Sequence, residues 1–413
     1  MTNLQQQFLS VLRCALAGQQ AKDPGNLTLN DCAELLDMAQ THKILPLFYE
    51  AIYHWSVLAG SPLAAQTRQR VRHQVFSQTM RTSEFLQLNS LLTQAGLRPM
   101  VVKGIVCRDL YPRPDHRPSG DEDILIPPEQ FAQCCLVFTD YGLQACTDPA
   151  DGNDSYEIPF RKPGSPLYIE LHKSLFPPQS DAYGELNLLF ADVFKHPVQL
   201  TLQDSPVWTL EYTDHLLYLI CHAFKHFLHS GVGIRQLCDI ILFANRYGNQ
   251  IQWERIIRSC QKIRAEKFAA AMFCIGKKYL CFDPKQSCYP EKWRNLAVDE
   301  LALLEDLLEG GLYGDNTMSR KHSSNITLDA VTASKQGKKA KNSVVLSLFP
   351  SANQLKGRYP YLKEKPWLLP VAWCSRIITY RSQSRKDPGN TPADALKIGN
   401  ERLELMKFYG ILE

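Results

Sequence analysis

The sequence predicts an α+β protein in which a small mixed β-sheet is flanked by N-terminal and C-terminal helical regions. Apolar residues recur at helical spacing through the first 95 residues and again from about residue 212 onward. Between these stretches, short apolar runs follow the order strand, helix, strand, helix, strands. The chain has 413 residues, more than one ordinary hydrophobic core holds. We therefore expect a helical region at 1–95, an α/β core at 96–205, a helical domain at 206–310, and a polar loop with a C-terminal helical extension at 311–413.

The elements of the expected sheet are short apolar runs bounded by glycine, proline or charged residues. Strands are expected at Pro99–Val102, Asp121–Ile126, Tyr156–Phe160 and Leu167–His172. A short helix, Ile105–Leu110, follows the first strand. A longer helix begins at Pro127-Pro128 and continues through Tyr141, where Gly142 ends it.

The C-terminal side of the chain has helical periodicity in several further segments. Helices are expected at Leu216–His229, Gly233–Tyr247, Ile251–Tyr279, Trp293–Leu308 and Asn400–Tyr409. Residues 314–343 are polar instead, and a solvated loop is the expected structure. This stretch includes Lys335, Lys338, Lys339 and Lys341.

The composition is that of a globular protein, with 45% apolar and 21% charged residues. A net charge of +4 is small for this length, so nucleic acid is not expected as a partner. No window of 18 uninterrupted apolar residues occurs, and the N-terminus has no basic segment before an apolar one. We therefore expect no membrane partner and a cytoplasmic location. The sequence does not indicate an oligomeric state.

The 13 cysteines are scattered, and no CxxC pair occurs. This usage predicts reduced, mostly buried thiols. Cys274, Cys281 and Cys288 are spaced seven apart, which fits core packing better than the short ligand spacings of zinc sites.

Asp121 and Asp123 are the most informative pair of residues in the chain. They lie two apart on an expected strand, so both carboxylates project from the same face. Two oxygen ligands so placed can hold one or two Mg²⁺ ions, and paired metals stabilise the attacking and leaving oxygens of an in-line displacement at phosphorus. Glu170 is the candidate third carboxylate. Alternation places it opposite the apolar side chains of Leu167–His172.

Lys103-Gly104 lies at a strand-to-helix junction, where a phosphate can bind. Glycine there lets backbone N–H groups approach an anion at the helix N-terminus. Lys103 adds a positive charge against the triphosphate. Arg117, in the loop that leads to the strand of Asp121, either contacts the nucleotide phosphate or holds Asp121 in place.

Three histidines, His222, His226 and His229, share one face of an expected helix. Two such histidines can bind zinc, but the HExxH form requires a glutamate where Ala223 stands. The alternatives are a phosphate or substrate contact through Lys225 and His226, and structural hydrogen bonding.

Arg235, Asp239 and His172 are further polar residues with structural interpretations, and His172 also has a catalytic one. Arg235 and Asp239 are four apart on a helix and can pair with each other. His172 either assists a proton transfer or anchors its strand. No GxSxG, P-loop or GxGxxG occurs in a suitable context, which argues against serine hydrolases, P-loop NTPases and Rossmann enzymes.

The combined pattern resembles the uncharacterised bacterial nucleotidyltransferase family, which belongs to the DNA polymerase β-like nucleotidyltransferase superfamily. The first block of the resemblance comprises Lys103-Gly104, Tyr111-Pro112, Arg117 and Gly120-Asp121-Glu122-Asp123-Ile124-Leu125-Ile126. Glu170-Leu171-His172 resembles the third-carboxylate motif. Later blocks are His222-Ala223-Phe224-Lys225-His226 with Arg235 and Asp239, and Arg358-Tyr359-Pro360 through Trp373 and Arg376. The resemblance extends from about residue 30 to the end.

This resemblance implies transfer of a nucleoside monophosphate from an NTP to an acceptor, with release of pyrophosphate. Asp121, Asp123 and Glu170 would bind two Mg²⁺ ions as catalytic ligands. The phosphate-binding candidates are Lys103, Gly104, Arg117, Lys225 and His226. Two departures matter: the superfamily has glycine-serine where this chain has Lys103-Gly104, and an apolar residue where it has Glu122. Glu122 indicates either an exposed strand face or a competitor for the metal.

The resemblance does not supply the acceptor, which is a small molecule or a protein. One rival is a protein AMP- or UMP-transferase of toxin–antitoxin type. Another is a non-catalytic scaffold, which the atypical phosphate loop favours and the three carboxylates oppose. A template-independent RNA polymerase is a weaker rival, because no basic-aromatic RNA groove is evident in the sequence.

Overall fold

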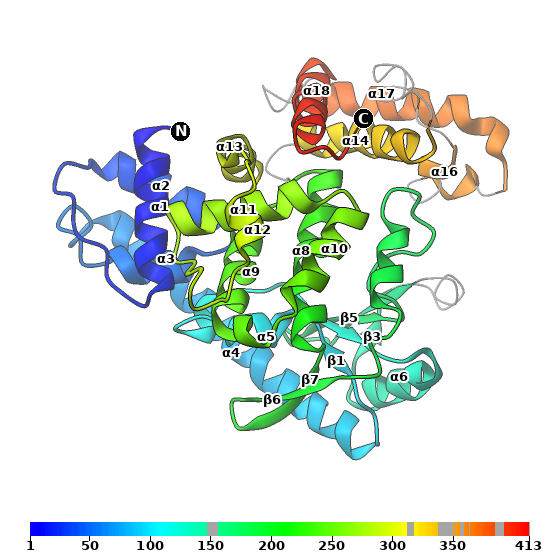
Figure 1. Ribbon diagram of the computed structural model, residues 1–413, viewed down its shortest axis with the longest axis horizontal. Helices are drawn as coiled ribbons and strands as arrows, with labels where there is room; N and C mark the ends of the chain where they lie inside the picture. The colour runs from blue at the N-terminus through cyan, green and yellow to red at the C-terminus, as the bar shows by residue number, and fades with distance from the viewer. Residues whose placement is uncertain are drawn as a thin grey trace. The chain divides into compact units, whose positions relative to one another are not determined.

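The computed structural model describes residues 1–146, 156–311, 318–337, 349, 352–355, 359–362, 364–384 and 392–412. Figure 1 shows the chain coloured from the N-terminus to the C-terminus. The chain divides into two compact units. The first unit comprises Met1–His222 and Ile234–Glu300, and the second comprises Ala223–Gly233 and Leu301–Glu413. The four regions expected from the sequence remain a prediction.

The first 95 residues are helical, as expected. They form α1 (Asn3–Leu16), α2 (Leu29–Thr41), α3 (Leu45–Ile52) and the long α4 (Pro62–Gln94). A capping box begins α1, in which Thr2 accepts from the Gln5 backbone N–H and the Gln5 side chain accepts from the Thr2 N–H. Thr28 and Asp31 begin α2 in the same way.

Seven strands form one mixed sheet within the described residues, in the order β3-β4-β5-β2-β1-β7-β6. The central pairs β2–β5 and β1–β7 are parallel, and the other neighbouring pairs are antiparallel. Together with the surrounding helices, this confirms the expected α+β class with a mixed sheet. The strands are β1 (Met100–Val101), β2 (Glu122–Leu125), β3 (Gln144–Ala145), β4 (Glu157–Arg161), β5 (Tyr168–His172), β6 (Val198–Leu202) and β7 (Ser205–Thr209).

One face of the sheet packs against α4 and α6 (Phe131–Asp140), which lie beside the strands in Figure 1. Phe85 of α4, Phe138 of α6, Ile124 of β2 and Ile169 of β5 belong to this single buried cluster. Because strand residues alternate, the residues next to Ile124 and Ile169 project from the opposite face. Asp123 is one of them, so the core fixes which face of the sheet carries the carboxylates.

The β6–β7 hairpin is absent from the elements expected from the sequence. Its two turn residues, Gln203 and Asp204, have φ values of 47° and 61°. A two-residue turn with both φ angles positive normally contains Asn-Gly, Asp-Gly or Gly-Gly. Gln-Asp gives no such signal, and the expected sheet therefore lacks β6 and β7.

The helices that follow the sheet in the first unit are α8 (Tyr212–His229, whose C-terminal half belongs to the second unit), α9 (Ile234–Tyr247), α10 (Trp253–Lys262), α11 (Glu266–Tyr279) and α12 (Glu291–Arg294). A continuous helix over Ile251–Tyr279 is wrong, because the chain turns at Arg264 with φ 58°. The Ala265 N–H donates to the Cys260 carbonyl across this turn, the bond that closes a helix C-terminus. One helix over Trp293–Leu308 is wrong too, since α12 ends before α13 (Glu300–Gly310) begins.

The second unit contains α14 (Met318–Lys335), α16 (Ala352–Leu355), α17 (Leu369–Ser384) and α18 (Pro392–Phe408). The solvated loop expected at 314–343 is therefore wrong for residues 318–335. The buried face of α14 includes Ser319, Ser323 and Thr327, so a polar sequence conceals a packed helix. Lys335 ends this helix, whereas Lys338, Lys339 and Lys341 lie outside the described residues.

A buried ion cluster holds the second unit together. Arg320 and Arg402 both approach the Asp306 carboxylate, and Arg402 also donates to the carbonyls of Phe227 and His229. Short helical turns complete the described elements of the chain. These are α5 (Gly104–Arg108) and the 3-10 turns Pro114–His116, Pro128–Gln130, Gly184–Phe190, Gly248–Gln250, Pro360–Leu362 and Pro366–Leu368.

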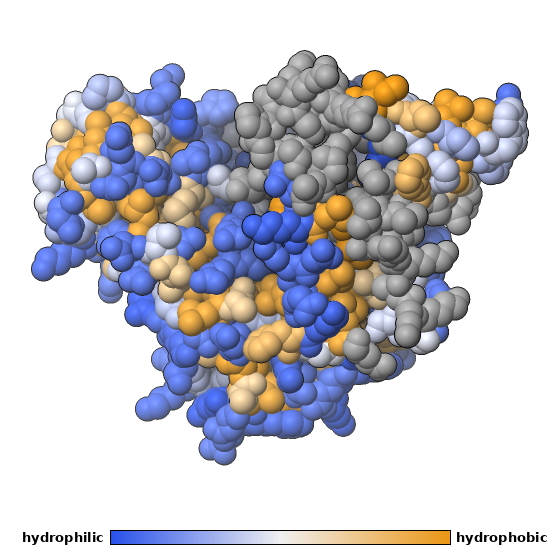
Figure 2. Space-filling view, turned by 90° about the horizontal axis from the view of Figure 1, so that it is seen from above, coloured by the Kyte–Doolittle hydropathy of each residue, from blue (hydrophilic) through white to orange (hydrophobic). Residues whose placement is uncertain are grey.

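The surface of the described residues mixes apolar and polar side chains. In Figure 2 the apolar residues, in orange, form separate patches among hydrophilic ones in blue. No helix in the described part of the chain is both long enough and apolar enough to span a membrane. All 13 cysteines are free thiols. Six of them are buried, fewer than the mostly buried set expected, and Cys288 is exposed rather than packed in a core.

Candidate active site

The strand register brings two of the expected carboxylates together. Asp123 of β2 lies directly beside Glu170 of β5, because the two parallel strands pair Asp123 with Glu170. Both side chains project from the face opposite the α4–α6 core, as the alternation predicts. Asp121 lies just before β2, and its charge acts on Glu170.

His172 joins Asp123 and Glu170 to form a group that can hold a metal ion, which we call the Asp123 group. Ligand atoms of Asp123, Glu170 and His172 all lie within 4.8 Å of one another. The His172 Nε2 atom is 3.6 Å from Asp123 Oδ1 and 3.8 Å from Glu170 Oε2. It is the one group with this property that the described residues contain, and Asp121 is not part of it.

Buried atoms in this group lack hydrogen-bond partners among the described residues. They are Asp123 Oδ2 and both ring nitrogens of His172, although Nδ1 has a charge partner in Glu157 Oε2 at 3.4 Å. Buried polar atoms are almost always paired, so an orphaned set of this kind fits an ion that is not part of the chain. Two carboxylates suit Mg²⁺ or Mn²⁺, and the imidazole nitrogen favours a transition metal. Sequence reasoning considered His172 only for proton transfer or as a strand anchor, since its closeness to Asp123 depends on the register.

The charges around the group are mostly negative. Burial raises the pKa of Glu170 to about 7, and the negative charges of Asp123 and Asp121 contribute to the increase. Burial also acts to raise the pKa of Asp123, but Lys103 and His172 outweigh it and hold that pKa well below its ordinary value. The raised pKa of Glu170 shows that Lys103 only partly offsets the burial and crowding of these carboxylates, which favours cation binding.

Lys103 provides the positive charge in direct contact with the carboxylates. Its ammonium group lies 2.8 Å from Asp123 Oδ1 and 3.1 Å from His222 Nε2. The Lys103 side chain is 13% exposed and that of Glu170 is 28% exposed. A ligand can therefore reach both residues from solvent, so Lys103 is positioned to meet an incoming anion.

Glu122, the acid between the aspartates, faces away from this group. It is fully buried and lies 2.6 Å from the guanidinium of the equally buried Arg108. The Ile105 backbone N–H, in the first turn of α5, donates to Glu122 Oε2 at 2.8 Å. Both interpretations of Glu122 are therefore wrong. Its strand face is not exposed, and its carboxylate binds Arg108 and the Ile105 N–H instead of competing for a metal.

This arrangement explains why glycine is needed at position 104. Gly104 has φ +50°, and an added Cβ would lie 1.8 Å from Glu122 Oε2. The chain's own carboxylate thus occupies the backbone N–H of Ile105, where a phosphate contact was expected. The two departures from the superfamily pattern, Lys103-Gly104 and Glu122, form one structural unit. A phosphate contact at Gly104 itself remains a prediction.

We expect Gly104→Ala to destabilise the protein more than a glycine replacement at a comparable backbone angle. A left-handed conformation alone costs a non-glycine residue about 1–2 kcal/mol, and the displaced Glu122 adds to this cost. Gly96→Ala is the matched control, because Gly96 has φ +76° and nothing within 4 Å of an added Cβ. Chemical denaturation of both variants measures the difference. Equal losses would show that Glu122 moves freely.

The loop that leads to Asp121 is anchored by a buried ion pair. Arg117 donates from Nε to Asp239 Oδ1 at 2.7 Å and from Nη2 to Oδ2 at 2.5 Å, and the Tyr111 hydroxyl donates to Oδ1 at 2.7 Å. Arg235 donates to the Pro118 carbonyl, so the expected Arg235–Asp239 pair is wrong. Arg117 is 3% exposed. Of its two expected roles, this geometry favours holding the Asp121 loop over touching phosphate.

The expected residues of α8 are spread over two environments. His222 contacts Lys103 in the first unit, while Lys225 and His226 belong to the second unit. The three α8 histidines do not form a metal-binding group among the described residues. Burial lowers the pKa of His229 to about 4, so this side chain is neutral near pH 7. Phosphate binding by Lys225 and His226 remains a prediction.

The sequence that forms this site matches a known protein family. Residues 28–280 match the model of the uncharacterised nucleotidyltransferase family, which is well over half of the chain. The chain belongs to this nucleotidyltransferase family. The match includes the whole sheet and all of the residues discussed around Asp123, and it ends before the C-terminal segment in which the sequence also showed a resemblance.

Membership of the nucleotidyltransferase family implies an NTP as a substrate and is consistent with a divalent metal at the Asp123 group. No curated protein matches the chain, and no solved structure does. The family match does not identify the nucleotide, the acceptor or the metal.

Proposed function

We propose that this nucleotidyltransferase moves a nucleoside monophosphate from an NTP to an acceptor and releases pyrophosphate at the Asp123 group. The main support is the register that pairs Asp123 with Glu170 on parallel strands, next to His172. Carboxylates held side by side with orphaned buried ligand atoms fit a divalent metal site. Asp121, at the edge of the group, would complete the ligand set when nucleotide and metal are present.

Metal and phosphate binding would be divided among named residues. Asp123, Glu170 and His172 would hold the ion, which when bound polarises phosphoryl oxygens and neutralises charge on the triphosphate. Lys103, in contact with Asp123, would bind the phosphate oxygens as a point charge. Arg117, Tyr111 and Asp239 would keep the Asp121 loop in position for both.

The chemical step is an in-line displacement at the α-phosphorus. The acceptor oxygen forms a bond to phosphorus, the bond to the bridging oxygen breaks, and pyrophosphate leaves. The acceptor proton is released to solvent, and Glu170 would help to hold the ion that lowers the pKa of the acceptor hydroxyl. A hydroxyl of a small molecule, a protein or another polymer satisfies this chemistry, so the acceptor class depends on a surface outside the group.

Nucleotide binding tests the proposal. Thermal unfolding is measured with each of the four NTPs and Mn²⁺ or Mg²⁺, on wild type and on Asp123→Asn/Glu170→Gln. At a ligand concentration 100-fold above its Kd, the wild type should gain about 2.7 kcal/mol of stability. The double variant should gain far less, and Asp140→Asn, an exposed acid of α6, should respond like wild type. If no NTP stabilises the wild type, the protein is a non-catalytic scaffold.

A further inference from the structure

A groove between α3 and α4 is lined by aromatic and basic side chains that have no role in the proposed metal site. It forms an open hollow of about 680 Å³ lined by both helices and by His116. We call it the α3–α4 groove. Three aromatic side chains, Tyr49, Tyr53 and Phe76, line it together with Arg68 and Arg72.

Two of the three aromatic side chains of the groove are available to a ligand, whereas Tyr49 is 5% exposed and donates to the Ala64 carbonyl. Phe76 is 68% exposed and Tyr53 is 43% exposed, although large apolar side chains are usually covered. Arg68, Arg72 and Phe76 are spaced four apart, so they form one row along α4. Neither arginine forms an ion pair with any residue that the structure describes.

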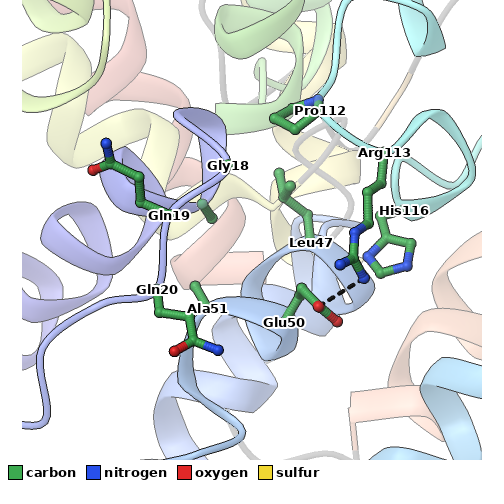
Figure 3. A pocket seen from close by; sticks show the side chains of 10 residues that line it. Gly18, Gln19, Gln20, Leu47, Glu50, Ala51, Pro112, Arg113 and His116 are labelled. Carbon is green, nitrogen blue, oxygen red and sulfur yellow. Dashed lines mark ion pairs between the residues drawn. The ribbon is translucent and has the colours of Figure 1, made fainter.

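The helix that carries this row is basic. From Pro62 to Ser83, α4 contains four arginines and one histidine but no acidic residue. The acid in the groove, Glu50, is paired with Arg113 at 2.7 Å, and Figure 3 shows this pair beside His116 in the adjoining cavity of about 300 Å³. The groove therefore offers unneutralised positive charge next to exposed aromatic rings, and its partner should be anionic and planar.

We propose that the α3–α4 groove binds single-stranded nucleic acid. Arginines that track phosphates beside aromatic rings that stack on bases are the two elements of such binding sites. A duplex hides its base faces, and an acidic peptide would use the arginines but leave Tyr53 and Phe76 without a matching surface. The small net charge of the whole chain conceals this local concentration on α4.

The groove is attached to the segments that carry the metal ligands. Thr79 of α4 donates to Asp115 at 2.6 Å, and Arg81 donates to the carbonyls of Ser119 and Pro166, just before β2 and β5. His116 lines the groove and precedes Asp121 by five residues, a span of at most about 18 Å. If the proposed nucleotidyl transfer holds, the bound strand is the acceptor, and its terminal hydroxyl lies within a few nucleotides of the Asp123 group.

Binding of fluorescein-labelled 12-nucleotide RNA and DNA, followed by fluorescence anisotropy without NTP, tests the groove. Phe76→Ala should weaken binding by at least about fivefold, and Phe76→Trp should retain it. Arg68→Ala/Arg72→Ala should reduce the slope of log Kd against log salt by about 1.4, near 0.7 for each lost phosphate contact. Arg70→Ala, an exposed arginine outside the groove lining, is the matched control and should bind within about twofold of wild type.

Three results would overturn the proposal: no saturable binding by wild type, an equal reduction of the salt slope in Arg70→Ala and in Arg68→Ala/Arg72→Ala, or equal competition by poly-glutamate or by a 12-base-pair duplex. Because the assay contains no nucleotide, it separates failure of the groove from failure of the proposed transfer reaction. The melting temperature of the same variants without ligand should stay close to that of wild type, which shows that they are folded.

Discussion

Asp123→Asn should reduce the rate of pyrophosphate release by more than about 100-fold. Replacing a residue that only hydrogen-bonds to a metal ligand already costs up to about 100-fold. Asp123 is buried, lies beside Glu170 and contacts Lys103, so its loss removes a proposed metal ligand and a charge partner together. Asparagine has nearly the same shape, which limits the structural effect to the lost charge. Asp140→Asn is the control, because this acid is exposed at the end of α6.

A coupled assay that detects pyrophosphate measures the effect on the NTP that stabilises the wild type. A stable Asp123→Asn protein with at least a tenth of the wild-type rate would remove Asp123 from the catalytic ligands. A loss restricted to KM would instead indicate that the residue binds nucleotide without taking part in the chemical step.

The second large effect is expected at the buried ion pair between Arg108 and Glu122 of β2. Arg108→Met should lower the free energy of unfolding by about 3–5 kcal/mol, because Glu122 would keep a buried charge without its partner. Both side chains have no exposed surface, so solvent does not screen the loss. Arg70→Met, at an exposed position on α4, should change stability by less than about 0.5 kcal/mol.

Adding Glu122→Gln to Arg108→Met should recover part of this loss, since replacing both members of a buried ion pair costs less than removing one. Chemical denaturation monitored by circular dichroism gives the midpoint and slope for each variant. If Arg108→Met unfolds at the wild-type midpoint, Glu122 is neutral in the folded protein. The helix α5 would then begin on a protonated acid rather than on a carboxylate.

Local pattern was enough to predict the central strands and the face of the sheet that carries the acids. Asp123 and Glu170 have apolar neighbours, and a period of two assigns each side chain to a face. Partners distant in sequence were not predictable in this way. Arg117 and Asp239 are 122 residues apart, and the local alternative, Arg235 with Asp239, was the pair suggested by helical spacing.

Elements whose turns or buried faces lack the usual residues were missed. The β6–β7 hairpin turns at Gln203-Asp204, and the break between α10 and α11 turns at Arg264, all with positive φ and none with glycine. The helix α14 buries serine and threonine in its first half and apolar residues only from Ile326 onward, so its apolar period is short. The same limit applied to the α3–α4 groove, whose aromatic and basic residues come from two helices and converge only in the fold.

Crystals grown with Mn²⁺ and a non-hydrolysable NTP, measured at the manganese absorption edge, locate the metal directly. The proposed site predicts an anomalous peak in contact with the Asp123 and Glu170 carboxylates, next to His172, with Lys103 turned toward the phosphates. A peak among the histidines of α8, or no peak at the Asp123 group while nucleotide is bound, would contradict it.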